Sequence, residues 1–186
     1  MRRVSVLVLT LGVLGALTTL STASVAEAQE GRPTYIGFGL GPTVGLRGGG
    51  VAFKLEESVG YHVLEVGDHP GLFVGGALAQ SFAGGSAVLA FGGRVGFDAR
   101  VFHNSSLSLL VSPHTTVGAS VSIIDVGDGG GRQTSGAFNL GFAGEVRLVM
   151  ADDRATVWVR PIGFDLHISK GVGANYDILV GGSYNF

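Results

Sequence analysis

Apolar and polar residues alternate with a period of two over long segments of this chain. The clearest example, residues 107–123, has apolar residues at Leu107, Leu109, Val111, Val117, Ala119, Val121 and Ile123. The polar residues of this segment are Ser108, Ser112, His114, Thr116, Ser120 and Ser122. Successive side chains of a β-strand point to opposite faces, so this period predicts a strand with one apolar and one polar face.

Three further segments carry the same alternation. In residues 51–63 the apolar positions are Val51, Phe53, Leu55, Val59, Tyr61 and Val63, opposite Lys54, Glu56, Ser58 and His62. In residues 87–102 they are Leu89, Phe91, Val95, Phe97 and Val101, opposite Arg94, Asp98 and Arg100. In residues 136–150 they are Phe138, Leu140, Phe142, Val146, Leu148 and Met150, opposite Asn139, Glu145 and Arg147.

One segment changes phase in its middle. In residues 155–168, the apolar positions switch parity at Pro161. Proline cannot donate to a strand ladder, so we predict a β-bulge near this residue. The bulge would place both Arg160 and Asp165 on the polar face.

Seven turn-like stretches divide the chain into eight segments. They are residues 47–50, 67–71, 83–86, 103–106, 125–135, 151–154 and 170–174. Each segment between them has the roughly 9–11 residues with which a tilted strand crosses a bilayer. We therefore predict an all-β fold, an eight-stranded antiparallel up-and-down transmembrane β-barrel.

Composition indicates which face of the barrel meets lipid. Charged residues make up 14% of the chain and hydrophobic residues 46%, whereas a soluble surface usually carries about 25–35% charged residues. The polar face consists mainly of small residues, which suits the narrow lumen of eight strands. We expect the apolar face outside, against lipid. The alternative is a soluble periplasmic barrel with its apolar face inside, binding a small hydrophobic ligand.

The N-terminal region has the order of a secretory signal peptide. Two arginines precede an apolar run from Val4 to Leu20, and Ala26-Glu27-Ala28 forms an A-x-A site. We predict a signal peptide over residues 1–28 and the barrel over residues 29–186. The chain has no cysteine and a formal net charge of −2, so we expect no disulfide and no nucleic-acid partner.

The charges on the polar face form the candidate site. We predict a polar network in the lumen made of Lys54, Glu56, Arg94, Asp98, Arg100, Glu145, Arg147 and Asp165. Asp177 is a ninth candidate. Buried charges of both signs must pair to offset their desolvation, so we predict a salt-bridged, largely closed lumen. The histidines do not have metal-ligand spacing, and we expect no metal or cofactor.

Aromatic residues cluster near the end of the predicted barrel that holds the chain termini. We expect them to form a girdle at the membrane interface, and they are Tyr35, Phe102, Trp158, Tyr184 and Phe186.

The last residues, "LVGGSYNF", together with the signal peptide and the eight segments, resemble small bacterial outer-membrane β-barrel proteins of the OmpA and OmpX type. The resemblance implies a Gram-negative outer-membrane protein in contact with membrane lipids. It also implies that Gly181, Tyr184 and Phe186 are an assembly signal for the barrel-assembly machinery, although Leu179 departs from the polar residue common at the motif's first position. We expect a structural or surface-interaction role without catalysis.

A catalytic alternative comes from the sequence His167-Ile168-Ser169. It resembles the His-x-Ser pair of PagL-type lipid A deacylases, in which a histidine activates a serine for acyl transfer. Lys170 and Gly171 depart from the continuation of that motif, and Asp177 is the only candidate for the missing acid in the last segment.

Overall fold

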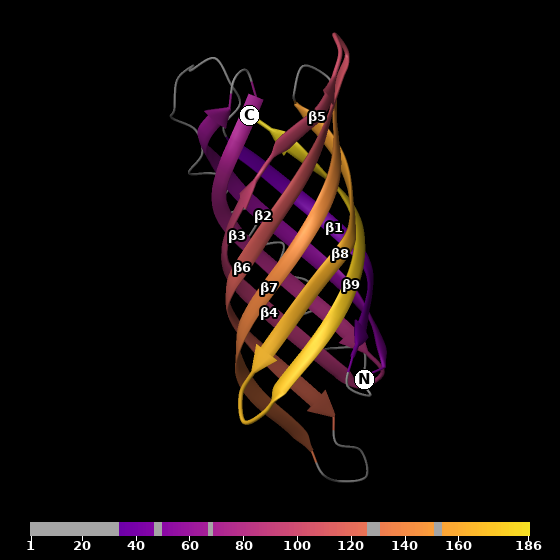
Figure 1. The fold of residues 1–186 in the computed structure, drawn as a ribbon. Coiled ribbons are helices and arrows are strands. Elements are labelled where there is room, and N and C mark those ends of the chain that lie inside the picture. Colours follow the sequence, from indigo (N-terminus) through magenta and orange to yellow (C-terminus); the bar gives the residue numbers. More distant parts are fainter. Residues whose placement is uncertain (1–33, 47–49, 67–68, 126–130, 151–153) are drawn as a thin grey trace. The chain divides into compact units, whose positions relative to one another are not determined.

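The computed structural model describes residues 34–46, 50–66, 69–125, 131–150 and 154–186. The strands within these ranges are β1 (Thr34–Gly45), β2 (Val51–Val66), β3 (His69–Ala83), β4 (Ser86–Phe97), β5 (Ala99–His103), β6 (Leu107–Asp125), β7 (Arg132–Met150), β8 (Ala155–Ile168) and β9 (Val172–Asn185) (Figure 1). The described ranges contain no helix with the length and hydropathy to cross a bilayer. The predicted signal peptide lies outside the described residues.

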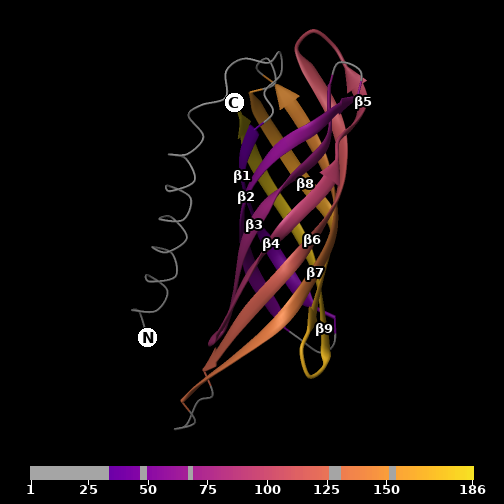
Figure 2. The same cartoon turned by 90° about the vertical axis from the view of Figure 1, so that its left-hand side faces the viewer.

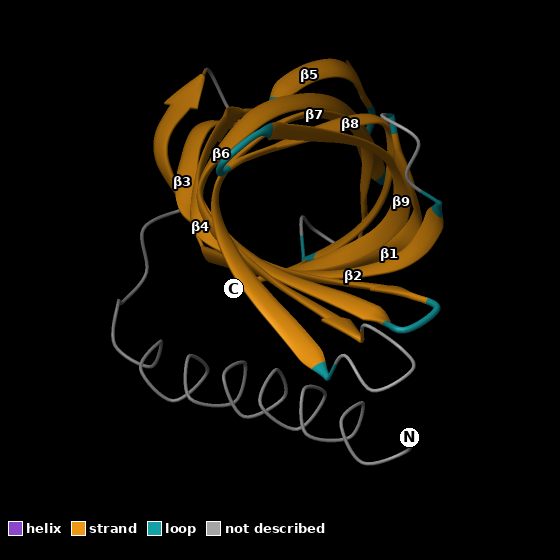
Figure 3. Cartoon of the chain, turned by 90° about the horizontal axis from the view of Figure 1, so that it is seen from below, coloured by secondary structure: helices purple, strands orange, loops and turns teal. Residues whose placement is uncertain are grey.

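The strands form one closed antiparallel barrel. β1 pairs with β2 and with β9, and β4 pairs with both β3 and β6, so the sheet has no open edge along most of its length (Figure 3). The all-β, eight-stranded prediction is confirmed, since β4 and β5 are two parts of one strand interrupted at Asp98. Gly96 pairs with His114 and Ala99 with Val111, so the register continues across the interruption. Pro113 lies between these two partners and has no N–H to donate.

The two ends of the barrel differ in what they hold. One end, which we call the terminal end, holds both ends of the barrel sequence, where Phe186 N–H donates to Thr34 O at 2.9 Å. The turns after β2, β5 and β7 also lie at the terminal end. The opposite end, the distal end, holds the turns after β1, β3, β6 and β8. Most turns are short.

The longest hairpin extends past its neighbours at the distal end. β6 and β7 have 19 residues each and pair out to Asp125 and Arg132 (Figures 1 and 2). The turn predicted over residues 125–135 is therefore shorter than expected, because strand pairing continues into it.

Apolar side chains cover the outside of the barrel. Each strand exposes at least one large apolar side chain, with exposed fractions from 37% to 66%. Charged side chains such as Glu56, Asp98 and Arg160 are buried instead. This distribution is the reverse of a soluble fold, in which burial of apolar surface drives folding. The alternative of a soluble barrel required the apolar face inside, and the structure places it outside.

The bulge predicted near Pro161 is present. The register of β8 against β9 shifts between Arg160 and Gly163. Before the shift Val159 faces outward, and after it Ile162 does, although the two residues have opposite parity. Because of the bulge, Arg160 and Asp165 both face the lumen although they have opposite parity, and only 2% of the surface of Arg160 is exposed.

The prediction of an aromatic girdle is wrong for two of its five residues, and the other three face outward as a girdle requires. Phe102, Tyr184 and Phe186 are exposed on the outside, whereas Tyr35 and Trp158 are buried in the lumen. Alternation explains the error, because position along a strand sets the height of a side chain and parity sets its direction. Both residues have the parity of the polar face.

Glycines make room for these two rings. A Cβ at Gly60 would lie 2.5 Å from Cζ of Tyr35, and a Cβ at Gly39 would lie 2.8 Å from Cζ2 of Trp158. The Trp158 ring also covers Gly181 on β9. The absence of a side chain at these positions lets the rings lie flat against the barrel wall, where they fill part of the lumen.

Candidate functional site

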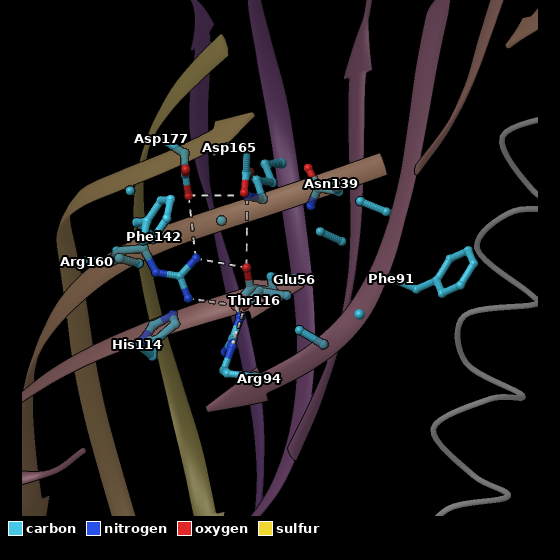
Figure 4. A pocket seen from close by; sticks show the side chains of 18 residues that line it. Glu56, Phe91, Arg94, His114, Thr116, Asn139, Phe142, Arg160, Asp165 and Asp177 are labelled. Carbon is cyan, nitrogen blue, oxygen red and sulfur yellow. Dashed lines mark hydrogen bonds and ion pairs between the residues drawn. The ribbon is translucent and has the colours of Figure 1, made fainter. Parts of the chain in front are cut away.

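Arg160 lies at the centre of the lumen and connects three other strands. Its Nη2 atom is 2.7 Å from Oε1 of Glu56 on β2 and 2.7 Å from Oε1 of Glu145 on β7. Its Nη1 atom is 3.5 Å from Oδ2 of Asp177 on β9 (Figure 4). The guanidinium thus crosses the barrel from β8, where Arg160 has the same inward parity as Thr156 and Trp158.

Glu56 receives a second arginine from the opposite wall. Arg94 on β4 places Nη2 2.6 Å from Oε1 of Glu56, and its Nε donates to the Thr116 hydroxyl on β6. Figure 4 shows Arg94 and Arg160 approaching Glu56 from different strands, while Phe91 points away from the cluster. Two arginines on one carboxylate form strong charge-assisted hydrogen bonds, so strands that are not neighbours in the sheet are held together through the lumen.

Lys54 occupies the distal side of this cluster. Its Nζ atom lies 2.6 Å from Asp165, 3.3 Å from Asp177 and 4.0 Å from Glu56. One ammonium group is therefore shared by three carboxylates. The Asp165 side chain is 20% exposed, compared with 2% for Asp177.

Arg147 extends the network towards the terminal end. Its Nη2 is 2.8 Å from Glu145, and its Nη1 is 3.3 Å from both carboxylate oxygens of Asp98. Asp98 also accepts from the Ser112 hydroxyl and lies 3.0 Å from Nε2 of His62. Asp98 stands at the interruption between β4 and β5, so the break in the strand holds its carboxylate among these partners.

Aromatic rings complete the terminal side of the network. The Arg147 guanidinium lies 5.7 Å from the ring centroid of Tyr35 and 5.2 Å from that of Phe73. Arg160 lies 5.4 Å from the ring of Trp158. These distances permit cation–π attraction, which is stronger where water is excluded.

The structure brings together seven of the eight residues predicted for the lumen, through contacts that run from Asp165 to Asp98. Arg100, the eighth, lines a cavity at the terminal end beside Asp98 and Arg147. The prediction did not include His114, which lies 3.9 Å from Glu145, or the pairing of His62 with Asp98. Alternation had already placed both histidines on the polar face, but they were not counted among the charged residues of the network.

The network leaves little open space in the middle of the lumen. The cavity around Glu56, Arg94 and Arg160 measures about 30 Å³, which is room for about two water molecules. Within the described ranges, no group of three or more potential ligand side chains is arranged to hold a metal ion. The ion pairs of the cluster join strands across the barrel.

The structure does not pair His167 with Ser169 in the described part of the chain. His167 Nδ1 is 2.9 Å from the Ser120 hydroxyl, and Nε2 is 3.2 Å from the Asn175 amide nitrogen. Ser169 is exposed at the turn before β9, and its backbone N–H donates to Gly171. Asp177 pairs with Lys54 and Arg160. The sequence placed His167 and Ser169 two residues apart, but both ring nitrogens have other partners.

A closed barrel of eight strands, apolar outside and ion-paired inside, defines a transmembrane β-barrel. Two of the solved structures to which the chain is similar illustrate this fold. The crystal structure of Neisserial surface protein A matches with a TM-score of 0.59 at 13% identity, over 82% of this chain and 97% of that chain. The N-terminal β-barrel domain of Pseudomonas aeruginosa OprF matches with a TM-score of 0.54 at 8% identity, over 84% of this chain and 100% of that chain. The chain therefore has the fold of small eight-stranded outer-membrane barrels.

No protein-family description and no curated protein matches this chain.

Proposed function

We propose that this protein is a non-catalytic integral β-barrel of the bacterial outer membrane, with a structural or surface-interaction role and a lumen closed by ion pairs. The observation that carries the proposal is the reversed distribution of side chains, with large apolar residues outside and Arg160 bridging carboxylates inside. The termini would lie in the periplasm and the distal end outside the cell. The β6–β7 hairpin is then the part that extends furthest outward.

Cell fractionation tests the location. We expect the full chain, expressed in a Gram-negative host, in the outer-membrane fraction, with an unheated form that migrates differently from the boiled form on a detergent gel. Phe142→Lys puts a charge on the outside near the middle of β7, where such a change costs about 2–4 kcal/mol, against about 0–1 kcal/mol near an interface. Val101→Lys, at the terminal end, is the matched control. The proposal would be contradicted if the wild-type protein were found in the soluble periplasm, or if both variants lost the same amount of protein from the outer-membrane fraction.

Conductance across planar bilayers tests the closed lumen. We expect no sustained open channel for the wild-type barrel, because Arg160 and Glu56 block its centre with fixed hydrogen bonds. The double variant Glu56→Ala/Arg160→Ala removes both charged side chains and is the positive control for the assay. A stable conducting state of the wild-type protein would overturn the closed-lumen part of the proposal and leave the location unaffected.

The assembly signal predicts a defect that appears only in cells. Tyr184 and Phe186 are exposed on the outside, with ring centroids 6.4 Å apart. We expect Phe186→Ala to reduce the assembled fraction in cells while refolding normally in detergent. Phe102→Ala removes another outward-facing ring at the same end, which is 52% exposed against 39% for Phe186, and serves as the control. Equal assembly of the two variants would remove the recognition role and leave Phe186 as an interface residue.

A further inference from the structure

Glu57 lies on the outside of the barrel, near the middle of β2. The preceding residue, Glu56, is buried in the lumen, so Glu57 points the opposite way. Its partners in the sheet, Phe38 on β1 and Leu78 on β3, are both apolar. Within the described ranges its carboxyl group has no hydrogen bond or ion pair. In a barrel that spans a membrane this group faces hydrocarbon, where an ionisable side chain indicates a functional contact.

The surrounding hydrocarbon decides which partner can satisfy Glu57. An isolated ionised carboxylate is very costly to bury, so the group takes its neutral form there. A neutral carboxyl group has one O–H donor and a carbonyl acceptor. These complement the donor and acceptor of a second, identical group. The partner that matches Glu57 is therefore Glu57 of another copy of this chain.

Two glycines lie side by side on the outer surface next to β2. Gly76 on β3 pairs with Val59 on β2 and with Gly93 on β4. Their chain neighbours Ala77 and Gly92 line the lumen, so both glycines face outward. A Cβ would have its nearest contact at 3.7 Å at Gly76 and at 4.0 Å at Gly93, and neither has a positive φ. A single barrel gives no steric reason for glycine at these positions, whereas the close approach of another chain does.

The other side of β2 carries large side chains. Phe38 and Leu40 on β1 are 45% and 38% exposed. Two barrels inserted in the same direction can be related by a two-fold axis along the membrane normal. An axis at Glu57 brings β1 of one copy against β3 of the other. The large side chains of each copy then lie against Gly76 and Gly93 of the other.

We propose that the outer face around Glu57, formed by β1, β2, β3 and Gly93, is the contact surface of a homodimer in the membrane. The carboxyl O–H of Glu57 in each copy donates to the carbonyl oxygen of Glu57 in the other. Leu40 of each copy packs against the two glycines of the other. The inference rests on the membrane location proposed above and adds a partner to it.

Cross-linking in the outer membrane tests this surface on the full chain. The chain has no cysteine, so a single introduced cysteine links two copies only through the same position. We expect a short bis-maleimide to give a dimer through Val59→Cys, on β2, and none through Val146→Cys, on β7 at the opposite side of the barrel. The two replaced side chains are 37% and 42% exposed.

Further changes in the Val59→Cys background test the carboxyl pair and the glycines. Glu57→Leu should reduce the cross-linked fraction by about fivefold or more, because it removes the hydrogen bonds between the copies. Glu57→Gln should keep most of the dimer, because an amide also has a donor and an acceptor. Gly76→Leu should block the contact, whereas Gly144→Leu, an outward position on β7, should not.

The unheated gel form of each variant shows whether the barrel has inserted, so a failure of the proposed location is distinguishable from a failure of the dimer. An inserted barrel that gives no dimer through Val59→Cys would overturn the inference. Equal amounts of dimer through Val59→Cys and Val146→Cys, or full cross-linking in the Glu57→Leu variant, would also overturn it.

Discussion

Replacing Arg160 with methionine is expected to lower the free energy of unfolding of the barrel by about 3–5 kcal/mol. The variant leaves Glu56, Glu145 and Asp177 buried without the guanidinium that they share. Methionine fills much of the same space, so the loss comes from uncompensated charge more than from a void. Urea unfolding of the barrel in lipid vesicles, followed by the fluorescence of Trp158, measures the difference.

Arg132→Met is the matched control for this variant. Arg132 is exposed at the start of β7, and removing an exposed charge costs within about 0.5 kcal/mol. In the double variant Glu56→Gln/Arg160→Met, the charge of one of the three carboxylates that Arg160 bridged is also removed, and part of the stability should return. If Arg160→Met is as stable as Arg132→Met, the ion pairs across the lumen do not hold the barrel together.

Gly39→Ala is expected to destabilise the barrel by about 1–3 kcal/mol, although it adds a single methyl group. A Cβ at this position would lie 2.8 Å from Cζ2 of Trp158, and the ring is held between Gly39, Gly181 and Arg160. The indole cannot move aside without disturbing β9 or the arginine cluster. The same urea unfolding experiment measures the effect. In variants that lack Trp158, tyrosine fluorescence replaces tryptophan fluorescence as the signal.

A pair of further variants separates this clash from a general cost of alanine. A Cβ at Gly144, on β7, would meet no atom within 4 Å, so Gly144→Ala should have little effect. In a Trp158→Leu background the cost of Gly39→Ala should fall, because the obstructing ring is gone. An equal cost of Gly39→Ala in both backgrounds would show that Trp158 is not the cause.

Gly181 has a structural reason to be glycine besides its place in the predicted assembly signal. A Cβ there would lie 2.7 Å from Cε2 of Trp158 and would overlap the backbone oxygen of Phe38. A substitution at Gly181 is therefore expected to impair refolding in detergent as well as assembly in cells. Phe186, whose ring is exposed outside, is the position at which recognition can be tested without this effect.

The alternation of apolar and polar residues was sufficient to predict the strands, their number and the face of the barrel to which most side chains point. Alternation has a period of two in any strand, whatever its neighbours, so it assigned Lys54, Glu56, Arg94 and Glu145 to the polar face, and the structure buries all four. The phase change at Pro161 likewise placed both Arg160 and Asp165 inside, because a bulge is a local feature of one strand. Tyr35 and Trp158 also have the parity of the polar face. They were assigned to the outside because aromatic residues are common at membrane interfaces, and parity alone would have placed them in the lumen.

The partners of these side chains depended on the closed barrel. Glu56 meets Arg94 and Arg160 because the tilt and stagger of the strands bring β2, β4 and β8 to the same height, and stagger is a property of the whole sheet. His167 hydrogen-bonds to Ser120, 47 residues away, and not to Ser169, two residues away. The small cavity around Glu56, Arg94 and Arg160 also exists only after closure, because residues from strands that are distant along the chain line it.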